Sequence, residues 1–214
     1  MVKASAATRA SSFLAKIDPD RLRQIQKRHA GSGERYAKYA DVGHWLTINL
    51  PRLEELALEG SPPKQILDLG CGAGFFLFLA KQSGHSCVGL DVGDYPLSDE
   101  LIELFGVYKI TWRIRAFEPL PDFGRQFDLI TAFSAAFNRN ADESRGWTRD
   151  EWEFFLNDLS RQLNPGGQIL LEINSGKDGR YFPDEIREYL VERGARVEGE
   201  RVYFDSLNTP KNAK

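Results

Sequence analysis

The sequence predicts an α/β protein with a doubly wound, mostly parallel seven-stranded sheet, helices on both faces and an N-terminal helical cap. Short apolar runs alternate with helical patterns between residues 64 and 207, as in parallel sheets whose strands are joined by helical crossovers. A glycine-rich turn at residues 70–74 joins the first of these runs to a helix. The 214 residues are 42% hydrophobic and 28% charged, which is typical of a folded globular chain.

Three helices are predicted before the sheet. Asp18 and Pro19 suit the N-cap and first position of a helix. A second helical stretch is expected around residues 36–39, and a third, with one apolar stripe, from about 45 to 58. Residues 1–17, before the first of these helices, are basic and contain no acid, and we expect them to be flexible. We therefore divide the chain into a flexible basic tail (1–17), a helical cap (18–60), a main domain (61–208) and a C-terminal tail (209–214).

The main domain is predicted to contain five strands followed by two short strands or a bent hairpin. Its longest helix is expected to begin at a T-x-x-E capping box formed by Thr148 and Glu151. The turn at residues 164–167, Asn-Pro-Gly-Gly, is expected to end that helix through left-handed and helix-breaking residues. The strands are expected at 64–69, 86–91, 109–115, 127–133 and 168–174, the hairpin at 195–207, and the helices at 75–82, 148–163 and 183–193.

Composition excludes several classes of protein. The net charge of −3 is too small to require nucleic acid or an acidic membrane as a partner, although the seven basic residues among the first 28 leave contact with RNA or anionic lipid open. Two cysteines do not make a disulfide framework, and no Cys/His cluster has zinc spacing, so no metal site is expected. No apolar run approaches the ~20 residues of a membrane span. The N-terminal residues contain no apolar stretch long enough for a secretory signal, and we expect cytoplasmic residence. Nothing in the sequence indicates an oligomeric state.

The glycine-rich turn is the strongest functional feature. Gly70, Gly72 and Gly74 let the backbone turn sharply and approach a ligand, and the helix that follows offers free amide donors. An acidic residue, Asp91, ends the next predicted strand, 21 residues after Gly70. A dinucleotide-binding turn of the form G-x-G-x-x-G would need glycine where Phe75 stands, so the sequence disfavours a nicotinamide cofactor.

The segments ILDLGCGAG (66–74) and VGLDVGD (88–94) resemble the class I, Rossmann-like S-adenosylmethionine-dependent methyltransferases. This resemblance covers residues 64–174 well and the following residues loosely. It implies S-adenosylmethionine as the cofactor, with the glycine loop along its methionine part. It also implies that Asp91 takes both ribose hydroxyls and that Asp68 supports the ammonium group directly or through water. A carboxylate can accept the protons of either partner.

The same resemblance extends to the adenine and sulfonium positions. Val92 is apolar, as the adenine edge requires, whereas Ala116 stands where members often carry an aspartate for the adenine amino group. The backbone of Phe117 remains available there. The fourth strand is expected to bring its last residues alongside the sulfonium. The predicted cofactor-binding residues are thus Asp68, Gly70, Cys71, Gly72, Gly74, Asp91, Val92, Ala116, Phe117, Phe133 and Ser134.

The acceptor is expected to be a small molecule methylated on oxygen or nitrogen. The Asn/Asp-Pro-Pro-aromatic tetrapeptide used for exocyclic amines is absent, since residues 134–137 are Ser-Ala-Ala-Phe. A non-catalytic binding module, an RNA or protein methyltransferase and a nicotinamide oxidoreductase remain as alternatives. The candidate catalytic residues are His44, which also suits helix packing beside Trp45, together with Tyr39 and Asn138; Tyr36, Lys38, Arg139 and Trp147 are candidates for the substrate wall.

Overall fold

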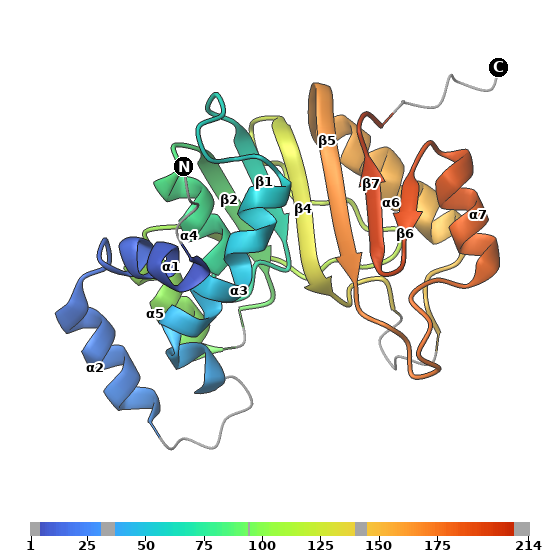
Figure 1. Ribbon diagram of the computed structural model, residues 1–214. Helices are drawn as coiled ribbons and strands as arrows, with labels where there is room; N and C mark the ends of the chain where they lie inside the picture. Colours follow the sequence, from blue (N-terminus) through green and yellow to red (C-terminus); the bar gives the residue numbers. More distant parts are fainter. Residues whose placement is uncertain (1–4, 31–36, 94, 140–144, 208–214) are drawn as a thin grey trace. The chain divides into compact units, whose positions relative to one another are not determined.

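The computed structural model describes residues 5–30, 37–93, 95–139 and 145–207 (Figure 1). Seven strands form one sheet in the order β3-β2-β1-β4-β5-β7-β6. The β1–β4, β4–β5 and β2–β3 pairs are parallel, and β7 is antiparallel to both β5 and β6. The predicted α/β class with a mostly parallel seven-stranded sheet is therefore confirmed.

The chain divides into two compact units, residues 1–63 with 71–111 and residues 64–70 with 112–214. The first unit thus joins the predicted cap to the segment that follows the glycine turn. Within the described ranges, no helix combines the length and the apolar character needed to cross a membrane. The elements of the first unit are α1 (Ala6–Leu14), α2 (Pro19–His29), η1 (Ala37–Ala40), α3 (Val42–Glu55), α4 (Phe75–Gln82), β2 (Ser86–Asp91), α5 (Pro96–Phe105) and β3 (Tyr108–Thr111).

The predicted flexible tail is wrong for residues 5–17. Ser5 caps α1 by accepting a hydrogen bond from the amide of Thr8, at 3.2 Å. Ala10 and Phe13 are buried, and α1 packs against α3. Apolar side chains spaced three residues apart thus give α1 a face to bury. The other predicted tail, 209–214, lies outside the described residues.

Ion pairs neutralise much of the basic N-terminal segment. Arg9 pairs with both Glu54 and Glu59, and Arg21 pairs with Glu103 at 2.9 Å. Two further arginines of α2 are paired with acids: Arg23 with Asp20 of the same helix and Arg28 with Glu100 of α5. Four of the seven basic residues that could have attracted RNA or anionic lipid are therefore paired with acids of the first unit.

Helix starts in the first unit follow the expected chemistry, but one helix was not predicted. Asp18 caps α2 as predicted, since its Oδ1 accepts from the amides of Asp20 at 2.9 Å and Arg21 at 3.1 Å. The missed helix is α5, which starts at Pro96 and ends at Gly106 in a left-handed conformation. The second predicted stretch appears as the 3₁₀ turn η1.

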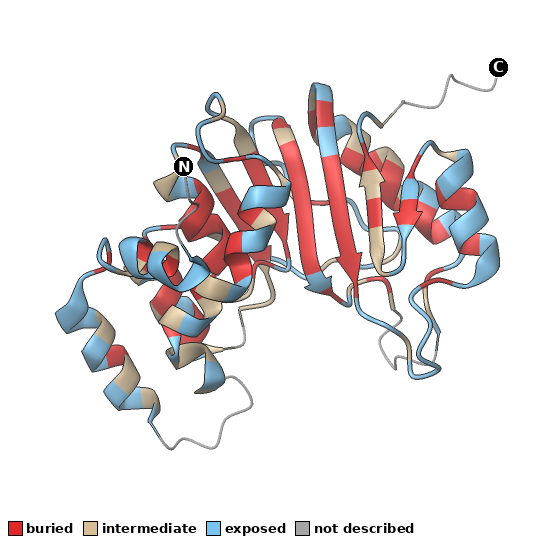
Figure 2. Ribbon diagram, viewed as in Figure 1, coloured by how far each residue is buried: buried red, intermediate tan, exposed pale blue. Residues whose placement is uncertain are grey.

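The second unit contains the centre of the sheet. Figure 2 shows β4 and the C-terminal half of β5 buried along most of their length. The capping box of Thr148 and Glu151 at the start of α6 is confirmed, as is the C-terminal hairpin. The elements of this unit are β1 (Gln65–Leu69), β4 (Phe127–Ala135), α6 (Arg149–Gln162), β5 (Leu163–Ile173), α7 (Asp184–Glu192), β6 (Arg196–Glu198) and β7 (Arg201–Phe204).

The predicted turn at residues 164–167 is instead the irregular start of β5. Leu163, the C-cap of α6, is extended and pairs with Phe127, and the register then shifts so that Gln168 pairs with Leu129. Gly166 lies within this register shift and has a left-handed backbone, with φ of 77°. The glycines therefore form a strand irregularity, and α6 ends without the expected left-handed cap.

Candidate functional site

The glycine turn connects β1 of the second unit to α4 of the first. Gly74 is the N-cap of α4 with φ of 76°, and a Cβ there would lie 2.5 Å from Ile102 Cδ1. Gly72 has φ of 55°, but, its two chain neighbours aside, no heavy atom of the described residues lies within 4 Å of the position that its Cβ would take. The turn is thus tightly packed at Gly74 and open at Gly72, which leaves room for a ligand against the backbone.

Backbone amides hold the carboxylate of Asp91 at the end of β2. Its Oδ2 accepts from the Gly72 amide and its Oδ1 from the Val92 amide, both at 2.7 Å. The amide of Cys71 donates to the carbonyl of Leu90 at 3.1 Å, so the loop is fastened to the same strand end. Asp91 is partly exposed, and each carboxylate oxygen can accept a further hydrogen bond.

Asp68 lies inside the second unit. It is 3% exposed, and its Oδ1 accepts from the hydroxyl of Thr131 at 2.7 Å. The two residues face each other in the β1–β4 register. This bond fixes the Asp68 carboxylate one residue before β1 ends.

Two non-glycine residues on the predicted cofactor list have a left-handed backbone. Phe117 has φ of 58° and is 57% exposed, and Ser134 has φ of 52° at the end of β4. The Ser134 hydroxyl bonds to Glu172 Oε1 at 2.9 Å. The neighbouring Phe133 is buried. Such conformations cost about 1–3 kcal/mol each and occur preferentially at functional sites.

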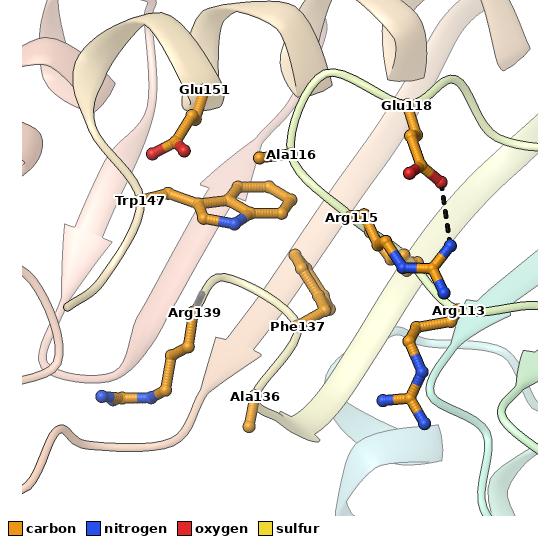
Figure 3. Close-up of a pocket in the computed structure, with 10 residues that line it drawn as sticks. Arg113, Arg115, Ala116, Glu118, Ala136, Phe137, Arg139, Trp147 and Glu151 are labelled. Carbon is orange, nitrogen blue, oxygen red and sulfur yellow. Dashed lines mark hydrogen bonds and ion pairs between the residues drawn. The ribbon is translucent and has the colours of Figure 1, made fainter. Parts of the chain in front are cut away.

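A cavity of about 610 Å³ opens within the second unit. Figure 3 shows the rings of Trp147 and Phe137 between Arg139 on one side and Arg113 and Arg115 on the other. Three of its lining residues, Ala116, Arg139 and Trp147, are among the predicted cofactor or substrate residues. The full lining is Arg113, Ile114, Arg115, Ala116, Glu118, Ala136, Phe137, Arg139, Trp147 and Glu151.

The two acids of the cavity wall are engaged by arginines. Glu118 accepts from Arg115 at 3.1 Å (Figure 3). Glu151 accepts from both terminal nitrogens of Arg145, at 2.6 and 2.9 Å, and from the Thr148 amide at 2.6 Å. The Arg145 hydrogen bonds, aided by those of Thr148, lower the pKa of Glu151 to about 2 although burial opposes this. Glu151 is therefore a fixed anion whose charge is already balanced.

Two catalytic candidates, His44 and Tyr39, lie in the first unit. His44 is exposed in the first turn of α3, and its ring meets Trp45 edge-on at 5.7 Å between centroids. The ring of Tyr39 contacts Trp45 at 4.7 Å and Phe75 at 6.1 Å. Both residues thus belong to an aromatic cluster at the start of α4.

Asn138, the third candidate, lies in the second unit. It is 4% exposed, and in the described part of the chain its Oδ1 has no hydrogen-bond partner. It lines a smaller cavity of about 70 Å³ that also contacts Arg139 and Trp147. Across the described residues, no group of three or more His, Cys, Asp or Glu is placed to hold a metal ion.

Residues 66–167 match a family model described as a methyltransferase domain. The chain is 27% identical to a tRNA U34 carboxymethyltransferase of Campylobacter jejuni subsp. doylei over 152 residues, 70% of this chain and 47% of that protein. It is 27% identical to a ubiquinone biosynthesis O-methyltransferase of Pseudomonas aeruginosa over 136 residues, 62% of this chain and 54% of that protein. The chain thus spans about half the length of these curated relatives.

Solved structures share the fold. A TehB-like SAM-dependent methyltransferase from Corynebacterium glutamicum is similar with a TM-score of 0.51 and 21% identity, over 89% of this chain and 100% of that one. An O-methyltransferase family protein from Burkholderia thailandensis has a TM-score of 0.50 and 14% identity, over 80% of this chain and 59% of that one. At these identities the likeness concerns the fold alone.

Proposed function

We propose that this chain, whose residues 66–167 match a methyltransferase-domain model, is a class I S-adenosylmethionine-dependent methyltransferase that transfers a methyl group to an oxygen or nitrogen atom of a small acceptor. When bound, the cofactor supplies an electrophilic methyl group, which is transferred by in-line displacement. One observation carries the proposal: the Asp91 carboxylate, held by the Gly72 and Val92 amides, stands beside an open glycine turn.

The residues of the turn suit the cofactor chemically. Asp91 would accept the two ribose hydroxyls with the lone pairs that the backbone amides leave free. Gly72 would lie against the methionine part, in space that a side chain would fill. Val92 would border the adenine, and Asp68 would support the ammonium group through its fixed carboxylate. The other predicted cofactor-binding residues keep, within this proposal, the contacts that the family resemblance implies; they are Gly70, Cys71, Gly74, Ala116, Phe117, Phe133 and Ser134.

The catalytic candidates differ in what they can do. His44 and Tyr39 carry groups that can take up a proton from an acceptor hydroxyl or amine. The amide of Asn138 cannot act as a base, but its buried Oδ1 can accept a hydrogen bond and so orient a donor. We therefore assign any proton transfer to His44 or Tyr39 and an orienting role to Asn138.

A small acceptor is favoured over RNA. The two sets of curated relatives differ in what they are named for, tRNA U34 in one and ubiquinone biosynthesis in the other. The basic N-terminal segment, which would be the natural RNA contact, is largely ion-paired within the first unit. The large cavity has a volume within the range of small-molecule sites, about 300–1,000 Å³.

Calorimetric titration with S-adenosylmethionine, its demethylated product and NADH tests the cofactor. We expect the first two to bind and Asp91→Asn to weaken both by about 10- to 100-fold, because a charged hydrogen-bond acceptor is lost. Asp205→Asn, at an exposed position after β7, is the matched control and should bind normally. Unchanged affinity in Asp91→Asn, or binding of NADH alone, would refute the assignment. Binding without any turnover in an acceptor screen would favour a non-catalytic module.

A further inference from the structure

We propose that the 610 Å³ cavity binds the methyl acceptor as a planar anion, an aromatic carboxylate held between arginines over an aromatic floor. The identification of this molecule as the acceptor rests on the proposed function. The chemistry of the cavity does not, because it follows from the residues that line it within the second unit.

The floor of the cavity is rigid and aromatic. The Trp147 and Phe137 rings lie 5.7 Å apart between centroids, at 53° to each other. Trp147 is 3% exposed and packs edge-on against Trp152 at 5.5 Å and Phe155 at 5.3 Å. Rings fixed in this way give the cavity an apolar, aromatic side that an aromatic ligand can contact at little entropic cost.

The wall of the cavity has more positive than negative charge. Three arginines and two glutamates line it, and Glu151 is already balanced by Arg145, which lies outside the lining. Glu118 is paired with Arg115. The net positive charge of the lining therefore favours a ligand that carries a negative charge.

Arg139 is the guanidinium best placed to receive that anion. It donates to the Asn174 carbonyl at 3.1 Å, and in the described ranges no carboxylate lies within ion-pair distance of it. A guanidinium has five N–H donors in a planar fork that matches a carboxylate. Among the described residues, the Asn174 carbonyl is thus the acceptor of the hydrogen bond that Arg139 donates, and its other N–H groups can meet a ligand.

A single small acid fits these observations better than a nucleic acid. An RNA backbone requires a track of cations over a long surface, whereas these arginines line one cavity, with Arg139 on one side of the Trp147 and Phe137 rings and Arg113 and Arg115 on the other (Figure 3). We therefore make RNA binding an outcome of the test.

The test is a tryptophan-fluorescence titration of the full chain with benzoate, with its neutral counterpart benzamide and with cyclohexanecarboxylate, which has the charge without the aromatic ring. We expect benzoate to bind at least about tenfold more tightly than either, because charge-assisted bonds and ring contacts are both needed. Arg139→Gln should abolish the preference over benzamide, and Arg139→Lys should retain part of it. Arg161→Gln, an exposed arginine at the end of α6, is the matched control and should behave as wild type.

Calorimetry with S-adenosylmethionine on the same samples separates the two proposals. Cofactor binding together with equal affinity for benzoate and benzamide would overturn the anion site and leave the methyltransferase assignment standing. Anion binding that persists without any cofactor binding would overturn the acceptor role together with the proposed function. Mutual exclusion of benzoate and the cofactor would also overturn the acceptor role. The anion site would also be overturned if an RNA oligonucleotide bound through Arg139 in a salt-dependent manner and benzoate did not bind.

Discussion

Replacing Glu151 with glutamine should remove a stabilisation that depends on pH. Glu151 is 6% exposed and accepts hydrogen bonds from Arg145 and from the amide of Thr148. These bonds, those of Arg145 above all, lower the pKa of the carboxyl from 4.5 to about 2. Glutamine at the third helical position keeps the cap but removes the charge.

The size and the pH window of this effect follow from the two pKa values. The gap between 4.5 and about 2 corresponds to roughly 3.4 kcal/mol at neutral pH. Because the Arg145 side chain is 50% exposed, water screens the pair, and we expect about 2 kcal/mol. The folded pKa is the lower one, so the stabilisation is fully present well above pH 4.5 and is lost as the pH falls toward about 2.

Urea unfolding of wild type and Glu151→Gln near neutral pH and near pH 3 measures this directly. The difference in the free energy of unfolding should be about 2 kcal/mol at neutral pH and less than about half of that near pH 3. Glu153→Gln, at an exposed position of the same helix, should change it by no more than about 0.5 kcal/mol at either pH. An equal loss for Glu151→Gln at both pH values would refute the ion-pair reasoning.

Two further substitutions test the packing of the first unit. Phe13→Ala should lower the free energy of unfolding by about 3–4 kcal/mol, because Phe13 is 6% exposed where α1 packs on α3. Ser12→Ala, on the exposed side of α1, is its control. An unchanged free energy of unfolding in Phe13→Ala would mean that residues 5–17 form a flexible tail after all. Gly89→Ala should cost about 1–3 kcal/mol in urea unfolding, because its Cβ would lie 2.5 Å from Cys71 Sγ and 2.9 Å from Leu77 Cδ1. Adding Cys71→Ala should recover part of that loss, and failure to recover any would mean that Cys71 is not the obstacle.

The alternating core could be predicted because its pattern is local. Apolar runs bounded by turn residues indicate strands wherever they occur, and the capping box of Thr148 and Glu151 was visible in four residues. The end of β3 could not be predicted from such a local pattern, and the predicted strand at 109–115 is wrong beyond Thr111. The run from 109 to 115 alternates throughout, but β2 ends at Asp91, which pairs with Thr111. Beyond Thr111 no partner strand remains in this pairing, so Arg113 and Arg115 leave the strand and line the cavity.

The N-terminal helix could not be predicted because its stability comes from another element. Ala10 and Phe13 are one turn apart in a segment otherwise rich in alanine and serine. A helix of nine residues is marginal alone. It becomes favourable when α3 covers its apolar face and Glu54 and Glu59 pair with Arg9. Those acids lie 45 and 50 residues away in the chain, beyond any local pattern.

The backbone supplies an argument that the sequence could not. Phe117 and Ser134 were placed near the cofactor by resemblance alone, and that role stays a prediction. Both have the left-handed conformation that side chains disfavour. Ser134 is held in it by Glu172 at its hydroxyl and by Asn174, which donates to its carbonyl at 2.7 Å. Two hydrogen bonds thus support a strained residue near the end of β4, and strained residues of this kind cluster at functional sites. Phe117 follows β3, Ser134 lies in β4, and the segments after both strands line the cavity. We therefore expect substitutions of Phe117 and Ser134 to change ligand binding more than the free energy of unfolding.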